Sequence, residues 1–190
     1  MSTPTKLPRQ SRRPARRTRG GTQPLPLSRE DVLDAALPLL AVHGVDGLTV
    51  RAVADALGIS SPAIYHYVSG RDDLIDRLCE RAAADIDLDV DPECPRTDAI
   101  VAVLLRMGRA FARYPGVASR VLIARRRSPS ADRITDVVRH LVLDGGFGTD
   151  LADDVLAALR FVFAGWLLNG ESDAGVLEQS IRAVLRGFAP

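Results

Sequence analysis

The chain has 190 residues, of which 46% are apolar and 26% charged, and a net charge of only +1. This length is enough to bury a core in one large or two small domains. Its longest apolar run, residues 161–168, is too short to span a bilayer, and no apolar stretch follows the basic N-terminus as in a secretory signal. We therefore expect a cytoplasmic protein with no membrane partner.

Residue types that commonly carry catalysis are few and scattered. Cys79 and Cys94 lack the spacing of metal ligands and are predicted to be reduced structural thiols. The three histidines form no cluster with cysteine or aspartate, and no nucleophile–base pair or phosphate-binding loop is visible. We therefore expect no metal, no cofactor and no catalytic residues, so the chain is not predicted to be an enzyme.

Charge is distributed unequally along the chain. Residues 1–27 contain seven basic residues and no acid, whereas the remaining 163 residues contain 18 basic and 24 acidic residues, a net charge of −6. Residues 1–26 are rich in Pro, Arg, Ser, Thr and Gly, and we predict that they form a disordered basic arm. A basic arm on an acidic body is typical of a polyanion binder, although a solubilising tail has the same composition.

From Leu27 onward the apolar residues recur with helical periodicity, and no alternating run predicts a strand. The first helix is predicted to begin at Ser28, whose hydroxyl can cap it while Asp31 reaches back. Gly44 is predicted to end this helix. Pro38 lies inside it without a backbone donor and predicts a kink. The expected fold class is therefore all-α.

Two short helices separated by a glycine turn come next. The first is predicted over residues 49–57 and is followed by Gly58, where a tight turn needs a positive φ. The other is predicted to begin at Ser60 or Ser61 and to end near Tyr67. Helix, short turn and short helix make a helix-turn-helix unit, although an ordinary helical hairpin can share this pattern. The apolar residues spaced to form its small core are Val50, Val53, Ala54, Leu57, Ile59 and Ile64.

Six further helices are predicted in the rest of the chain. They cover approximately residues 71–87, 97–114, 117–126, 131–143, 149–168 and 173–186. The predicted organisation is a disordered arm over residues 1–26, a three-helix helix-turn-helix domain over residues 27–70, and a second helical domain over residues 71–190.

Residues 27–78 resemble the DNA-binding domain of the tetracycline-repressor (TetR) family. The matching positions are Gly47-Leu48-Thr49-Val50-Arg51, Ala54, Leu57-Gly58-Ile59-Ser60, Ile64-Tyr65-His66-Tyr67-Val68, Arg71 and Leu74. A Tyr-x-Tyr-Val-x-x-Arg tail after the third helix separates this pattern from those of other helix-turn-helix families. The resemblance implies a DNA-binding transcriptional regulator, typically a homodimeric repressor that a small molecule releases from a palindromic operator.

The resemblance also implies which residues contact double-stranded DNA. Thr49, Tyr65 and Arg71 occupy positions where the family contacts phosphates, and Arg71 replaces the usual Lys. Arg51 matches a base-reading arginine of the tetracycline repressors, with a phosphate contact as the equal alternative. Tyr67 stands where the family commonly has His or Tyr. The exposed residues of the third helix expected to meet the major groove are Ser61, Pro62, Ala63, Tyr65 and His66.

Beyond residue 80 the resemblance is one of architecture, and it implies a helical domain that dimerises and binds a small ligand. The expected dimer contacts, for which packing within one subunit is the alternative, are Leu159, Phe163, Trp166, Leu177, Ile181 and Val184. The candidate ligand contacts, each of which would otherwise be an ordinary core residue, are Met107, Phe111, His140 and Phe161. The spacing contains no metal-assisted tetracycline site, so tetracycline is not predicted as the ligand.

Two other classes of protein compete with this interpretation. One is an all-α enzyme or carrier in which the N-terminal pattern is incidental, but the chain lacks the motifs of catalysis. The other is a helical interaction module whose basic arm meets an acidic protein. Only the regulator requires sequence-specific DNA binding.

Overall fold

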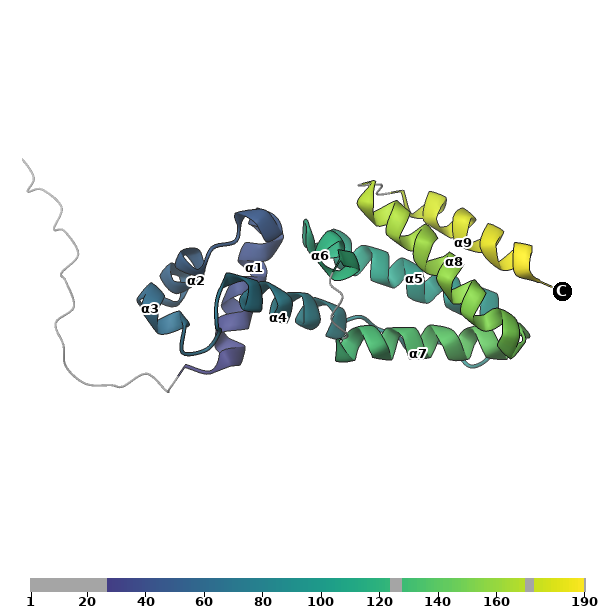
Figure 1. Cartoon of the computed structure of the whole chain (residues 1–190), viewed down its shortest axis with the longest axis horizontal. Coiled ribbons are helices and arrows are strands. Elements are labelled where there is room, and N and C mark those ends of the chain that lie inside the picture. Colours follow the sequence, from purple (N-terminus) through teal and green to yellow (C-terminus); the bar gives the residue numbers. More distant parts are fainter. Residues whose placement is uncertain (1–26, 124–127, 170–172, 190) are drawn as a thin grey trace, which may run out of the picture.

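A computed structural model describes residues 27–123, 128–169 and 173–189, and over these residues it is all-α, which confirms the predicted fold class. Figure 1 shows α1, α2 and α3 at one end, α5, α7, α8 and α9 at the other, and α4 leading from one group to the other. The helices are α1 (Arg29–Gly47), α2 (Val50–Leu57), α3 (Ser61–Ile64), α4 (Arg71–Ala84), α5 (Arg96–Ala112), α6 (Val117–Ile123), α7 (Pro129–Asp144), α8 (Thr149–Leu168) and α9 (Ala174–Phe188).

Helix α1 begins as its sequence predicts but continues past the expected end. Ser28 and Asp31 form the capping box, in which each side chain accepts from the other residue's backbone N–H. At Gly44 the backbone leaves helical geometry with a φ of 67°, and helical turns resume beyond it. Pro38 is exposed, and non-helical dihedral angles occur at Gly44 and not at Pro38. The break in α1 is therefore made by the glycine.

The helix-turn-helix unit is formed by α2 and α3, and α2 packs both on α3 and on α1. Thr49 caps α2, and Gly58 takes the left-handed conformation with a φ of 67° that the turn requires. Helix α3 ends at Ile64, earlier than predicted, because the next three residues form tighter i to i+3 turns, such as Tyr67 N–H to Ile64 C=O at 2.9 Å.

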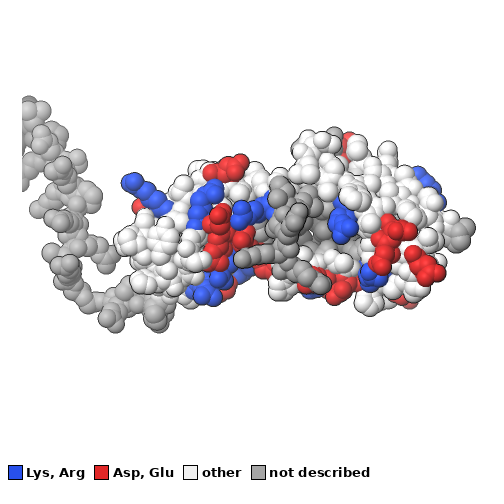
Figure 2. Space-filling model, in the orientation of Figure 1, with Lys and Arg blue, Asp and Glu red and all other residues white. Residues whose placement is uncertain are grey.

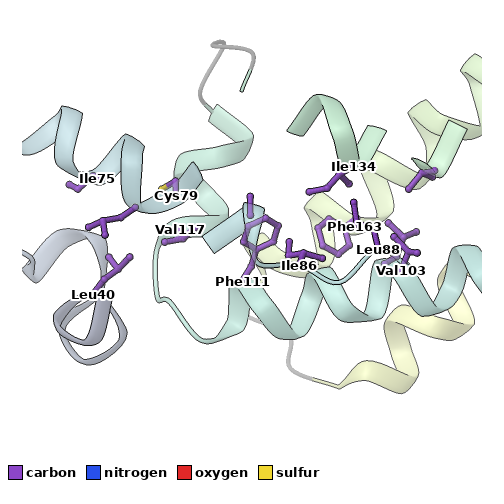
Figure 3. Packing of buried hydrophobic residues seen from close by; sticks show 14 of the residues in the cluster. Leu40, Ile75, Cys79, Ile86, Leu88, Val103, Phe111, Val117, Ile134 and Phe163 are labelled. Atoms are coloured by element: carbon purple, nitrogen blue, oxygen red, sulfur yellow. The ribbon is translucent and has the colours of Figure 1, made fainter. Parts of the chain in front are cut away.

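One hydrophobic core runs from the helix-turn-helix unit into the C-terminal bundle. Figure 3 shows Leu40 and Ile75 at one end of this cluster, and Phe111 and Phe163 further along it. Helix α4 links the two ends, since it contacts α1, α5, α6 and α7. Packed side chains on α4 therefore connect the helix-turn-helix unit to the C-terminal bundle.

Two glycines bring the end of α1 against the loop between α5 and α6. The backbone N–H of Val45 donates to the carbonyl of Pro115 at 2.8 Å. A Cβ on Gly44 would lie 3.0 Å from the Pro115 oxygen, and a Cβ on Gly116 would lie 3.0 Å from the Cβ of Val45. Both glycines also have positive φ angles, so this contact between the two parts of the molecule requires them.

Candidate nucleic-acid interface and ligand cavity

The N-terminus of α2 offers donors that suit a phosphate group. The Thr49 hydroxyl oxygen accepts a hydrogen bond from the Ala52 N–H at 3.1 Å, which leaves the hydroxyl proton available to a second partner. The first N–H groups of a helix have no intrahelical acceptor, and the helix dipole makes this end attractive to anions. Thr49 is also exposed, so a DNA backbone can reach these donors.

Arg51 lies on the outer face of α2, one turn from Asp55. Its side chain is 85% exposed, and its Nε is 3.8 Å from a carboxylate oxygen of Asp55. An exposed ion pair of this length holds the guanidinium weakly, so Arg51 can exchange its partner for a base edge or a phosphate.

Helix α3 and the turn after it combine one buried anchor with several outward side chains. Ile64 is fully buried, whereas Tyr65 is 57% exposed and His66 is exposed beside it. Pro62 is exposed as well, and the half-buried residues of this segment are Ser61, Ala63 and Tyr67. Tyr65 is among the few large side chains with apolar surface that the described residues leave in solvent, as expected of a contact residue.

Arg71 has a role that the sequence alone did not indicate. Its Nε donates to the carbonyl of Leu48 at 2.9 Å, and its Nη2 donates to the carbonyls of Val45 and Asp46. These carbonyls lie at the end of α1, where backbone acceptors lack helical partners. The guanidinium therefore ties α4 to the turn before α2. The feature of the sequence that could have indicated this role is the arginine in place of the usual lysine, because a lysine ammonium cannot present a planar fork of donors.

The described surface has no continuous basic face in the view of Figure 2, where acidic and basic side chains alternate. Residues 27–70 contain two basic and five acidic residues, which gives the helix-turn-helix segment a net charge of −3. The seven basic residues of the predicted arm lie outside the described residues. Most of the basic residues in the first 70 positions of the sequence therefore belong to the predicted arm.

A partly open cavity of about 190 Å³ lies between α5, α6, α7 and α8. The centroids of the Phe111 and Phe163 rings are 6.4 Å apart, and the ring planes are tilted relative to each other. Figure 3 shows both rings together with Ile134 of α7. The cavity is lined by Leu104, Met107, Phe111, Ala118, Val121, Ala131, Ile134, Thr135, Val138, Leu156, Leu159, Arg160, Phe163 and Leu167. Its lining is apolar apart from Thr135 and Arg160, two residues that the sequence did not single out.

Of the four candidate ligand contacts, the structure places two in the lining and two outside it. Met107 and Phe111 line the cavity. His140 is exposed, and its Nδ1 lies 2.7 Å from the carbonyl of Asp136. Phe161 is 73% exposed. It is two residues from Phe163, about 200° around α8, and therefore points to the opposite side of that helix.

The predicted dimer contacts are mostly core residues of one subunit, which is the alternative that the sequence left open. Leu159, Phe163, Leu177 and Ile181 are at most 6% exposed. The other two predicted contacts, Trp166 and Val184, are half-buried. The Trp166 indole N–H donates to the Asp173 carbonyl of the same subunit at 3.1 Å. Four of the six large apolar side chains exposed on the described residues lie instead on the outer faces of α8 and α9: Leu151, Phe161, Leu168 and Val176.

Polar contacts join α4 to two of the cavity helices. Arg120 of α6 pairs with Asp76 at 2.9 Å and with Asp72 at 3.4 Å. The Glu80 carboxylate accepts from the N–H and hydroxyl of Ser130 at the start of α7, at 3.0 and 2.6 Å. Burial opposes the charge on Glu80, but hydrogen bonds from Ser128 and Ser130 outweigh it and lower its pKa. Helix α4 is therefore held from α6 and from α7.

The described residues form neither a metal-binding cluster nor a membrane-spanning helix. Within the described ranges, no three His, Cys, Asp or Glu side chains are grouped so that they could hold a metal ion. No described helix combines the length and apolar character needed to cross a membrane.

Comparison with known proteins gives a consistent set of relatives. Residues 32–78 match the family model "Bacterial regulatory proteins, tetR family". The tetracycline repressor class A from transposon 1721 of Escherichia coli is 30% identical over 152 residues, which are 76% of this chain and 68% of the repressor. A helix-turn-helix transcriptional regulator of Saccharopolyspora erythraea is 30% identical over 146 residues, 77% of this chain, but the match spans only 59% of that regulator.

Solved structures share the fold at lower sequence identity. A variant of TetR from Acinetobacter baumannii AYE in complex with minocycline superposes with a TM-score of 0.71 at 23% identity, covering 85% of this chain and 96% of that one. ActR from Streptomyces coelicolor in complex with actinorhodin gives a TM-score of 0.66 at 21% identity, covering 83% and 74%.

Proposed function

Because this chain belongs to the TetR family of bacterial regulatory proteins, we propose that it is a homodimeric transcriptional repressor that a small molecule releases from a palindromic DNA operator. The observation that carries the proposal is the helix-turn-helix unit with Arg51, Tyr65 and His66 on its outer face. Such a unit inserts its second helix into the major groove. Acting on DNA, the protein would work in the cytoplasm.

The homodimer is supported by the apolar surface of α8 and α9. A soluble monomer has little reason to expose several large apolar side chains on two adjacent helices. Phe161 is 73% exposed and Leu168 is 55% exposed on α8, and Val176 is 46% exposed on α9. A second copy related by a two-fold axis would bury the same patch on both subunits. The two recognition helices would then meet half-sites about 34–36 Å apart.

Release by a ligand is supported by the position of the cavity. Helices α6 and α7 line it, and both hold α4 through Arg120 and Glu80. A ligand that displaces α6 or α7 would tilt α4 and change the separation of the two recognition helices. In proteins with two linked sites of this kind, binding at one site typically changes the free energy of binding at the other by about 1–3 kcal/mol. For release, the ligand must bind more tightly to the dimer conformation whose recognition helices do not fit the operator, since equal affinity for the two conformations would not shift their equilibrium.

The DNA-binding proposal predicts specific losses at the outer face. Arg51→Ala is expected to weaken operator binding by about 1–3 kcal/mol. If the guanidinium contacts a base, the variant should also lose the preference for that base at one position of the operator. Tyr65→Ala is expected to weaken binding about tenfold through loss of a charge-assisted hydrogen bond. Fluorescence anisotropy with DNA from beside the protein's own gene measures both changes.

Arg109→Ala is the matched control, because this exposed arginine lies on α5, outside both the helix-turn-helix unit and the proposed dimer face on α8 and α9. It should leave operator affinity unchanged. Equal affinity of the native protein for operator and unrelated DNA would contradict the proposed function, and native affinity in both Arg51→Ala and Tyr65→Ala would contradict this interface.

Replacing Arg71 separates its contact with α1 from its expected contact with phosphate. Arg71→Lys keeps the charge but loses the fork that reaches three carbonyls, so it is expected to destabilise the fold by about 1–2 kcal/mol with little change in the salt slope of DNA binding. Arg71→Ala should lose the same stability and also reduce the salt slope by about one charge. Thermal unfolding and anisotropy at several salt concentrations measure the two effects. A native melting temperature in Arg71→Lys would show that the carbonyl contacts contribute nothing.

A further inference from the structure

The lining of the cavity between α5 and α8 includes one exposed arginine, Arg160. Fourteen described residues line it, and among them Arg160 is the one charged side chain. Thr135 adds a hydroxyl, but this group already donates to the Ala131 carbonyl at 2.8 Å and is left as an acceptor. Arg160 is therefore the donor that the described lining offers to a polar ligand.

Nothing else in the described part of the chain neutralises Arg160. Its guanidinium takes part in no ion pair or hydrogen bond there, whereas Arg139 on the facing helix is paired with Asp153. On α8 itself the residues three and four positions away are all apolar, namely Leu156, Ala157, Phe163 and Ala164. These are the positions from which an acidic side chain could have reached it. An arginine between an apolar cavity and solvent is well placed to receive an anion from a bound molecule.

We propose that the effector bound by this cavity is a lipophilic anion, an aromatic or hydrocarbon body bearing a carboxylate or an equally acidic group that pairs with Arg160. The inference rests on the proposed function, since it names the chemistry of that ligand. The two phenylalanine rings and the aliphatic lining receive the apolar body, and the guanidinium receives the acid at the mouth. Bidentate pairing with a planar carboxylate is the geometry for which arginine is suited.

Size and charge exclude other classes of ligand. An apolar cavity of about 150 Å³ suffices for benzene, so about 190 Å³ is suited to a body of one or two rings. A cationic ligand would meet Arg160 with no described carboxylate in the lining to offset it. A highly polar ligand such as a sugar would leave its hydroxyls against aliphatic side chains.

A matched pair of probes tests the charge requirement without DNA. We would titrate the full-length protein with 2-naphthoate and with 2-naphthamide, which have the same rings but differ in charge, and measure binding by calorimetry. The native protein is expected to bind 2-naphthoate up to about fivefold more tightly, because Arg160 is exposed and its ion pair with the carboxylate is screened by solvent. Arg160→Gln should remove this preference by weakening naphthoate binding and leaving naphthamide binding unchanged.

Arg109→Gln is the control, since it removes the same charge from an exposed position on α5 outside the lining, and it should retain the native preference. Phe163→Ala should weaken both probes alike. Equal binding of the two probes by the native protein, binding of neither, or an unchanged preference in Arg160→Gln would each overturn the inference. Operator binding is measured separately. A protein that binds its operator specifically but binds both probes equally would therefore disprove the proposed ligand class and not the proposed function as a DNA-binding regulator.

Discussion

Phe161→Asp is expected to produce monomers that bind the operator at least a hundredfold less tightly than the native protein. Phe161 is 73% exposed in one subunit, so its apolar surface is available to a second copy. In a two-fold interface each substitution occurs twice. Losing the burial of one phenylalanine removes about 1.5–3 kcal/mol, so the pair removes about 3–6 kcal/mol before the aspartates are desolvated. A monomer can then occupy a single half-site.

Sedimentation velocity at micromolar concentration measures the first effect, and anisotropy with operator DNA measures the second. Circular dichroism should show a native helical content, because Phe161 contributes nothing to the core of one subunit. Val42→Asp is the control, since Val42 is 76% exposed on α1, far from α8 and α9, and the variant should stay dimeric. If Phe161→Asp remained a dimer, the apolar face of α8 would not be the interface.

Features that depend on neighbouring residues were predictable from the sequence. The capping box of Ser28 and Asp31, the threonine cap of α2 and the left-handed turn at Gly58 are decided within four residues, and the structure has all three. The all-α fold followed from periodicity that extends over whole helices. The end of α1 was predicted less well, because Gly44 makes a break within the helix rather than its end, and that choice depends on the loop at Pro115.

Helix α8 shows why the candidate dimer and ligand residues were not predictable individually. Apolar side chains occur all around this helix, with Leu159 and Phe163 on one side and Phe161 on the other. Periodicity identifies a buried stripe only where the opposite face is polar. Which face meets α5 and which meets solvent is decided by tertiary packing. The same limit applies to Arg71, whose three acceptors lie 23 to 26 residues away in the sequence.

Deleting residues 1–26 is expected to leave a folded protein that prefers the same operator but binds it far less tightly. The deleted segment carries seven basic residues, whereas residues 27–70 have a net charge of −3. Each phosphate neutralised by a basic side chain contributes about 0.9 to the slope of log affinity against log salt. If about half of the seven charges bind phosphates, the slope falls by about three, and affinity near physiological salt falls by about tenfold to a thousandfold.

Preference among DNA sequences should survive the deletion because Arg51 and the exposed residues of α3 remain. Anisotropy titrations between 50 and 300 mM salt, on operator and on scrambled DNA, measure slope and preference together. A full-length variant with the seven basic residues replaced by Gln separates charge from length, and it should behave like the deletion. An unchanged slope would make the segment a solubilising tail. Loss of all preference would instead make it a reader of bases, as minor-groove arms can be, because counterion release strengthens binding to any sequence alike.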